Sequence, residues 1–214
     1  AEYFFTGSYG DGGHGLTRIC ASAAYDRGAT GAGIKIAVLD SGVSTDDSGA
    51  VNLTDLDDNV VSFTSGSDLI GSDSVPNDEQ GHGTHVAGLI AAENNNDGGH
   101  HGVAYEADLF IYKVLNDNNR TVGNSVANGI NKARGDGVDI MNLSLGDFGT
   151  IGSNCNSASS CETYLGSFGY SALEAAGAAN IILVWSAGND SNSNPSVSSG
   201  AAIYDDDFKE TTVI

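Results

Sequence analysis

The sequence predicts an α/β domain with a mostly parallel central sheet. Short apolar runs typical of buried strands alternate along the chain with helical segments of about 10–14 residues. Such alternation is the pattern of βαβ units, in which each helix connects two parallel strands. The length of 214 residues suits one domain or most of one, and 40% hydrophobic residues are enough for a sizeable core.

The chain begins with a Gly-rich, irregular stretch over residues 1–33, which holds one helix candidate at 15–29, and residues 1–27 are expected to form an irregular N-terminal segment before the domain. The domain proper is expected to extend over 28–214. Its first strand contains Ile36 and Val38 and stops at Asp40, where a Gly turn follows. The next expected elements are a strand over 59–65 and a helix over 82–93.

The second half continues the alternation with three further strands, two helices and a last strand that is cut short. The helix at 125–138 carries apolar residues at helical spacing, and the run at 181–189 ends in a Gly-Asn pair. The expected strands cover 107–115, 139–146, 181–189 and 210–214, and the expected helices cover 125–138 and 170–181.

The charge balance is strongly acidic, with 28 acidic residues against 8 basic ones and a net charge of −20. Such a surface repels phosphate backbones, so we expect no nucleic-acid partner. We favour solubility, in a salty or extracellular setting, over specific cation binding as the reason for the acidity. No run of 18 apolar residues occurs, so no transmembrane segment is expected in this chain.

Two of the three cysteines, Cys155 and Cys161, lie close together in a polar stretch rich in Ser and Asn. A short disulfide is the favoured interpretation, and it would indicate an oxidising compartment; two free thiols are the alternative. The third, Cys20, is expected to be a small buried side chain.

Polar residues follow several of the predicted strands, where ligands bind in parallel α/β sheets. Asp40 ends the first strand, and His82 begins a helix in the run GHGTHVAG. A neutral imidazole accepts a proton from a hydroxyl nucleophile, and a buried Asp orients the ring and stabilises the imidazolium. The amide of Asn189 offers a donor for a developing oxyanion.

Four motifs in this order, AVLDSGV, GHGTHVAG, NLSLG and SAGN, closely resemble the subtilisin-like serine proteases. The resemblance implies a three-layer sandwich with helices on both faces of a mostly parallel sheet, and a polypeptide substrate. It implies that Asp40 orients the base, that His82 is the base, and that Asn189 is the oxyanion donor. Ser144, Leu145 and Gly146 would pair with the substrate backbone, and Ala187 and Gly188 would line the pocket floor.

The resemblance also assigns the residues around the catalytic candidate. His85 would be structural and pack the helix against the sheet. The glycines Gly81, Gly83 and Gly88 would let the helix approach neighbouring backbone and substrate. The acidity, the cysteine pair and the resemblance to this family together indicate a secreted or cell-surface protein. Residues 197–210 resemble those of bacterial surface members of the family, which suggests a bacterial protein.

The nucleophile is where the sequence departs from the family. The family's serine lies in a Gly-Thr-Ser motif after the SAGN strand, and no such motif occurs in this chain. We therefore expect a partial domain whose serine lies beyond residue 214, which would leave this chain alone inactive. A non-catalytic peptide-binding module is the alternative, and the oligomeric state is left open.

Metal and cofactor sites are weakly indicated. His82 and His85 are spaced like a metal pair, but the Glu of an H-E-x-x-H arrangement is missing and Asp40 and Asn189 would go unexplained. The glycines of GAGIKIAVLD precede the strand, whereas a dinucleotide fingerprint needs them after it. The resemblance implies no required cofactor. The resemblance suggests a structural calcium loop at Asn95, Asn96 and Asp97. A solvated turn without calcium is the interpretation that we favour for these residues.

Overall fold

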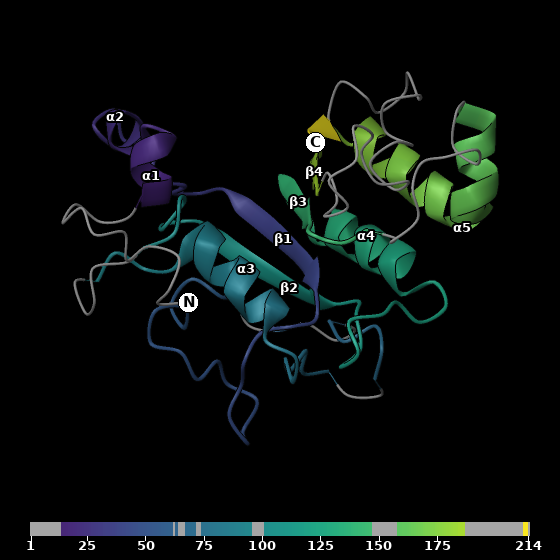
Figure 1. Ribbon diagram of the computed structural model, residues 1–214, viewed down its shortest axis with the longest axis horizontal. Helices are drawn as coiled ribbons and strands as arrows, with labels where there is room; N and C mark the ends of the chain where they lie inside the picture. Colours follow the sequence, from purple (N-terminus) through teal and green to yellow (C-terminus); the bar gives the residue numbers. More distant parts are fainter. Residues whose placement is uncertain are drawn as a thin grey trace.

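The structure is a computed structural model that describes residues 14–61, 63, 67–71, 74–95, 101–146, 158–186 and 212–213. Its centre is a parallel sheet with the strand order β2-β1-β3-β4-β5 (Figure 1). The strands are β1 (Lys35–Asp40), β2 (Asp108–Lys113), β3 (Ile140–Leu143), β4 (Ile182–Trp185) and β5 (Thr212–Val213). The prediction of a parallel α/β fold is confirmed.

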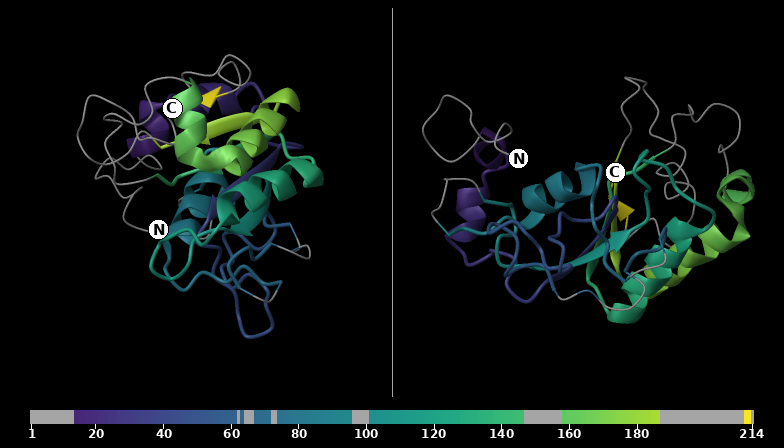
Figure 2. Two further views of the ribbon diagram at one scale, coloured as in Figure 1. Left: turned by 90° about the vertical axis from the view of Figure 1, so that its right-hand side faces the viewer. Right: turned by 90° about the horizontal axis from the view of Figure 1, so that it is seen from below.

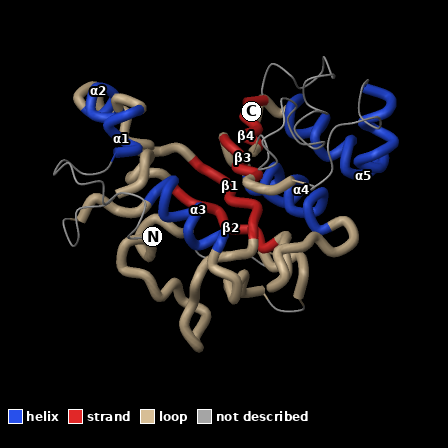
Figure 3. The backbone as a smooth tube through the Cα atoms, in the orientation of Figure 1, coloured by secondary structure: helices blue, strands red, loops and turns tan. Residues whose placement is uncertain are grey.

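Helices connect successive parallel strands, as the alternation in the sequence predicts. The connecting helices are α3 (His82–Ala91), α4 (Ser125–Asp136) and α5 (Ala158–Ala178). The stretch between β1 and α3 forms no helix or strand among its described residues (Figure 3). That stretch leads from the carboxyl end of β1 to the start of α3, and it therefore sets how these two elements meet.

Side chains of β1 alternate between two apolar clusters on opposite faces of the sheet. Ala37 and Leu39 pack with residues of α4 and α5, whereas Ile36 and Val38 pack with residues of α3. Figure 2 shows α3 on one side of the strands and α4 and α5 on the other. Helices thus cover both faces, which is the three-layer arrangement expected.

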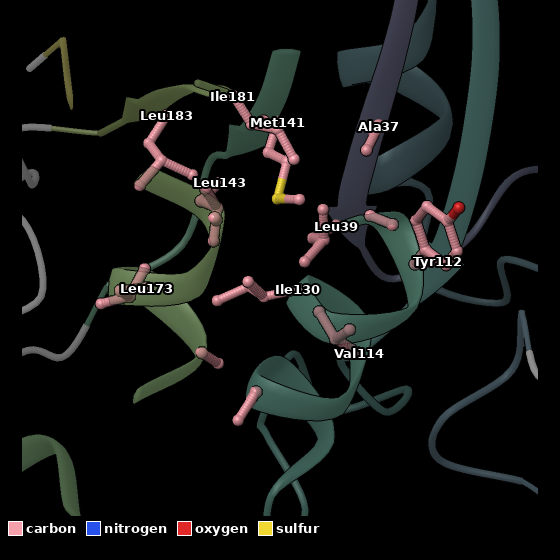
Figure 4. Packing of buried hydrophobic residues seen from close by; sticks show 14 of the residues in the cluster. Ala37, Leu39, Tyr112, Val114, Ile130, Met141, Leu143, Leu173, Ile181 and Leu183 are labelled. Carbon is pink, nitrogen blue, oxygen red and sulfur yellow. The ribbon is translucent and has the colours of Figure 1, made fainter. Parts of the chain in front are cut away.

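The larger cluster forms the core between the sheet and helices α4 and α5. Figure 4 shows Leu39 of β1, Ile130 of α4 and Leu143 of β3 converging in it, and all three are at most 2% exposed. Burying a side chain of this size contributes roughly 1.5–3 kcal/mol. The core therefore holds the strand that ends at Asp40 rigidly in place.

The N-terminal segment departs from the expected single helix over 15–29. It forms two short helices, α1 (His14–Arg18) and α2 (Ala21–Tyr25), separated at Cys20, whose φ of 56° is left-handed. A left-handed residue cannot continue a right-handed helix. Cys20 is exposed, so the expectation that it is buried is wrong.

Two further expectations differ from the structure. Residues 59–65 form only an isolated parallel bridge between Val60 and Leu109 among their described members. Helix α5 begins at Ala158, well before the predicted start at residue 170, so Cys161 lies in a helix and not in a loop. Cys155 lies outside the described residues, and the disulfide stays a prediction. No helix in the described part of the chain is both long and apolar enough to cross a membrane.

Candidate active site

Asp40 is held at the carboxyl end of β1 by its own backbone. Its side chain is fully buried, and its carbonyl oxygen accepts hydrogen bonds from Val114 and Leu115. The chain then turns sharply at Gly42, whose φ of 111° favours glycine. A Cβ there would lie 2.2 Å from the carbonyl oxygen of Pro76. The two backbone hydrogen bonds and the tight turn at Gly42 therefore fix the backbone position from which the Asp40 side chain projects.

His82 begins α3, and its ring meets this carboxylate. The distance from His82 Nδ1 to Asp40 Oδ1 is 2.7 Å, and the histidine side chain is 37% exposed. The hydrogen bond with Asp40 raises the pKa of His82; burial opposes this, and the charges of Asp40 and Asp78 add to it. The sheet edge and the helix start, 42 positions apart, therefore form one acid–base pair.

The pair favours one tautomer of the imidazole. When Nδ1 carries the proton that is donated to Asp40, Nε2 keeps a lone pair and acts as a base. Because the carboxylate is buried beside the ring, it stabilises the imidazolium that forms when Nε2 accepts a proton. The arrangement is suited to general-base activation of a hydroxyl group.

Only one of the three glycines around the histidines makes a close approach. A Cβ on Gly83 would lie 2.3 Å from the carbonyl oxygen of Gly42, and the Gly83 N–H donates to Ser41 Oγ at 2.9 Å. Gly81 and Gly88 have no atom within 4 Å of such a Cβ, although Gly81 has a left-handed φ of 95°. Gly83 therefore lets the first turn of α3 press against the turn after Asp40. His85 is half-buried, and its burial lowers its pKa.

Two charged residues that the sequence reasoning did not single out support this junction. Asp78 accepts hydrogen bonds from both the Asp40 turn and the first turn of α3. Lys113 is only 7% exposed, and its Nζ donates to the carbonyl oxygens of Ser41 and Asn77. Burial opposes the charge of Lys113, but Glu79 and Asp117 raise its pKa above the ordinary value. A lysine within the apolar run of β2 was the signal available in the sequence.

The predicted substrate-binding residues are described only in part. Ser144, Leu145 and Gly146 follow β3, and the carbonyl oxygen of Leu145 accepts from Ser186 Oγ at 3.0 Å. Ser144 Oγ accepts from Asn142 Nδ2 at 2.8 Å. Because β1 and β3 are parallel neighbours, the segment that follows β3 lies at the same edge of the sheet as Asp40 at the end of β1. Ala187, Gly188 and Asn189 lie outside the described residues.

The expected calcium loop is also only partly described. The side-chain amide of Asn95 donates to the carbonyl oxygen of Thr54, while Asn96 and Asp97 lie outside the described residues. Within the described ranges, no three His, Cys, Asp or Glu side chains are grouped so as to hold a metal ion. Calcium binding stays a prediction.

A buried carboxylate at a strand end, paired with a histidine at a helix start, defines an acid–base site on a parallel α/β fold. The family model described as the subtilase family matches residues 31–211, and the chain belongs to this family. It is 40% identical to Subtilisin BL of Lederbergia lenta over 132 residues, which are 62% of this chain and 44% of that protein.

Other relatives extend the match along the chain. Thermitase of Thermoactinomyces vulgaris is 39% identical over 66% of this chain and 46% of its own length. A thermostable alkaline protease of Halalkalibacterium halodurans is 37% identical over 82% of this chain and 41% of its own length. The chain therefore spans less than half the length of these curated relatives.

Proposed function

We propose that the protein to which this chain belongs is a secreted serine endopeptidase. The observation that carries the proposal is the 2.7 Å contact between Asp40 and His82, in a chain of the subtilase family. Several relatives are named as proteases, among them the alkaline protease of Shouchella clausii. The substrate class that follows is a polypeptide.

In the proposed reaction, a serine hydroxyl attacks the carbonyl carbon of a peptide bond while His82 Nε2 accepts the hydroxyl proton. Asp40 stabilises the imidazolium. The same proton then passes to the nitrogen of the leaving amine, and a water molecule hydrolyses the acyl-enzyme by the reverse sequence of proton transfers. The Asn189 amide donates to the oxyanion, for which one such donor is worth roughly 3–4 kcal/mol.

The serine in this proposal lies outside these 214 residues, since they contain no Gly-Thr-Ser motif. The lack of this motif in these residues also supports a second candidate, a peptide-binding module without a nucleophile. In both, a substrate strand lies along Ser144, Leu145 and Gly146. We further propose export from the cell, with Cys155 and Cys161 as a disulfide.

Two experiments on the full-length protein test the proposal. Replacement of His82 by Ala is expected to abolish most peptidase activity, and undiminished proteolysis would show that the base is elsewhere. A serine-directed phosphonate probe is expected to label the full-length protein, with slower labelling in the H82A variant. If no labelling occurs while a peptide still binds, the binding-module candidate replaces the peptidase.

A further inference from the structure

The carboxylate of Asp78 lies where the acid's turn and the base's helix meet. Its Oδ1 accepts hydrogen bonds from Ser41 Oγ at 2.9 Å and from the backbone N–H groups of Gln80 and Gly81 at 3.0 and 2.8 Å. Its Oδ2 accepts from the backbone N–H of Thr84 at 2.9 Å and from the Thr84 hydroxyl. One carboxylate therefore bonds to groups before, at and after the start of α3.

These bonds connect directly to both members of the acid–base pair. Ser41 follows Asp40, and its Oγ also accepts from the N–H of Gly83, the residue after His82. The Ser41 N–H donates to Asp40 Oδ1 at 2.7 Å, which is the same oxygen that His82 contacts. The chain Asp78–Ser41–Asp40 thus ends at the atom that orients the imidazole.

A second bond at Thr84 closes the link from the other side. The Thr84 hydroxyl, which donates to Asp78, also accepts from the backbone N–H of Ser44 at 3.0 Å. The turn after Asp40 is therefore attached to the first turn of α3 at Ser41 and at Ser44. Because Oδ2 is the oxygen that bonds to Thr84, its removal as an acceptor should loosen the attachment at Ser44 and Thr84, while Oδ1 still accepts from Ser41.

The charge of Asp78 also acts on the pair. Burial opposes ionisation of Asp78, but its hydrogen bonds with Thr84, Gly81 and Ser41 keep its pKa below the ordinary value. The negative charge contributes to raising the pKa of His82. Asp40 from β1 and His85 on the same helix also interact electrostatically with His82. Lys113 lies behind the Asp40 turn, where Glu79 pairs with it at 2.8 Å.

We propose that Asp78 is a positioning residue for the acid–base pair, holding the first turn of α3 against the Asp40 turn so that His82 Nδ1 meets Asp40 Oδ1. The expected effect of Asp78 on turnover depends on the proposed peptidase function. Its effect on the geometry and titration of His82 does not depend on that function. The two can therefore be tested separately.

The substitution that tests the role is Asp78→Asn. The amide oxygen can still accept from Ser41, Gln80 and Gly81, but the amide NH₂ would face the N–H donor of Thr84. The matched control is Asp46→Asn, which removes the same charge from the same long connection. The Asp46 side chain accepts from Ser48 and Ala50 through Oδ1, so an asparagine retains these bonds, and none of them reaches α3.

The first measurement is an NMR titration of the His82 imidazole in the full-length protein, with the resonances assigned by comparison with H82Q. We expect the midpoint to fall in D78N and to stay at the wild-type pH in D46N. An unchanged His82 midpoint in a folded D78N would overturn the proposal. Should D78N not fold, Thr84→Val provides the test, since it removes the hydroxyl and keeps the Asp78 charge. A wild-type Nδ1 proton signal in T84V would then count against the role.

The second measurement is the pH dependence of turnover. We expect kcat of D78N to fall about tenfold with KM within about twofold of wild type, since misplaced catalytic groups lower turnover more than binding. The acidic limb of the D78N pH profile should move to lower pH, because without the Asp78 charge the pKa of His82 falls and the ring becomes neutral at a lower pH. If the wild-type protein has no peptidase activity, the proposed function fails, and the NMR result alone still decides the role of Asp78.

Discussion

Gly83→Ala offers a direct test of why α3 begins as it does. The new Cβ would lie 2.3 Å from Gly42 O, 2.9 Å from Gly42 N and 3.1 Å from Ser41 N. All three are backbone atoms, so no side chain can rotate away. The closest approach falls about 1.1 Å short of the 3.4 Å at which ordinary contact begins, so the helix start must move away from the Asp40 turn.

A displacement of about 1 Å is enough to break the 2.7 Å bond between His82 and Asp40. We expect kcat/KM of the full-length protein on a chromogenic peptide to fall about 100-fold, and stability to fall by about 1–3 kcal/mol. The control is Gly88→Ala in the same helix, where a Cβ meets nothing within 4 Å. It should keep full activity and gain up to about 1 kcal/mol. Wild-type kcat/KM in G83A would refute the reasoning.

The raised pKa of His82 predicts that the acidic limb of kcat/KM lies at a higher pH than an unperturbed histidine would give, because only the neutral ring acts as a base. The same shift stabilises the fold fully below the unfolded pKa of about 6.5, and this contribution disappears as pH rises through the folded pKa. The melting temperatures of wild type and H82Q should therefore converge on raising the pH. Lys113→Met should cost about 3 kcal/mol in urea unfolding, because two carbonyls that accept from its buried ammonium lose their donor. Lys132→Met, which breaks a partly buried i,i+4 pair with Asp136, should change stability by only about 0.5 kcal/mol.

The sequence was sufficient to place Asp40 at a strand end and His82 at a helix start. Both positions follow from local patterns, namely an apolar run that stops at a Gly turn and a helical run that begins among glycines. The helices on both faces follow from the alternation of elements. The role of Asp78 was not predictable in this way, since its partners at Ser41 and Thr84 are brought together only by the fold.

The misplaced elements have physical reasons of the same kind. The run at 59–65 has β-forming residues, but its described pairing with β2 is one bridge at Leu109, whose N–H donates to the carbonyl oxygen of Asn59 and whose carbonyl oxygen accepts from the N–H of Val61. The Ser-rich residues before 170 predict a loop, because serine is a weak helix former, but the structure has helix from Ala158. That helix lies against α4 in the larger cluster through residues such as Leu173.

Strand β2 lies at one edge of the sheet, and several backbone groups on its outer side are hydrogen-bonded to the connection between β1 and α3. The N–H of Leu109 donates to Asn59, and the N–H of Lys113 donates to Ser67, while Leu69 returns a bond to Lys113. Edge positions whose hydrogen-bonding groups are occupied in this way, here Leu109 and Lys113, are poor templates for a strand from another molecule. The net charge of −20 makes copies of the chain repel one another, so charge and these occupied positions of β2 both oppose pairing along this edge.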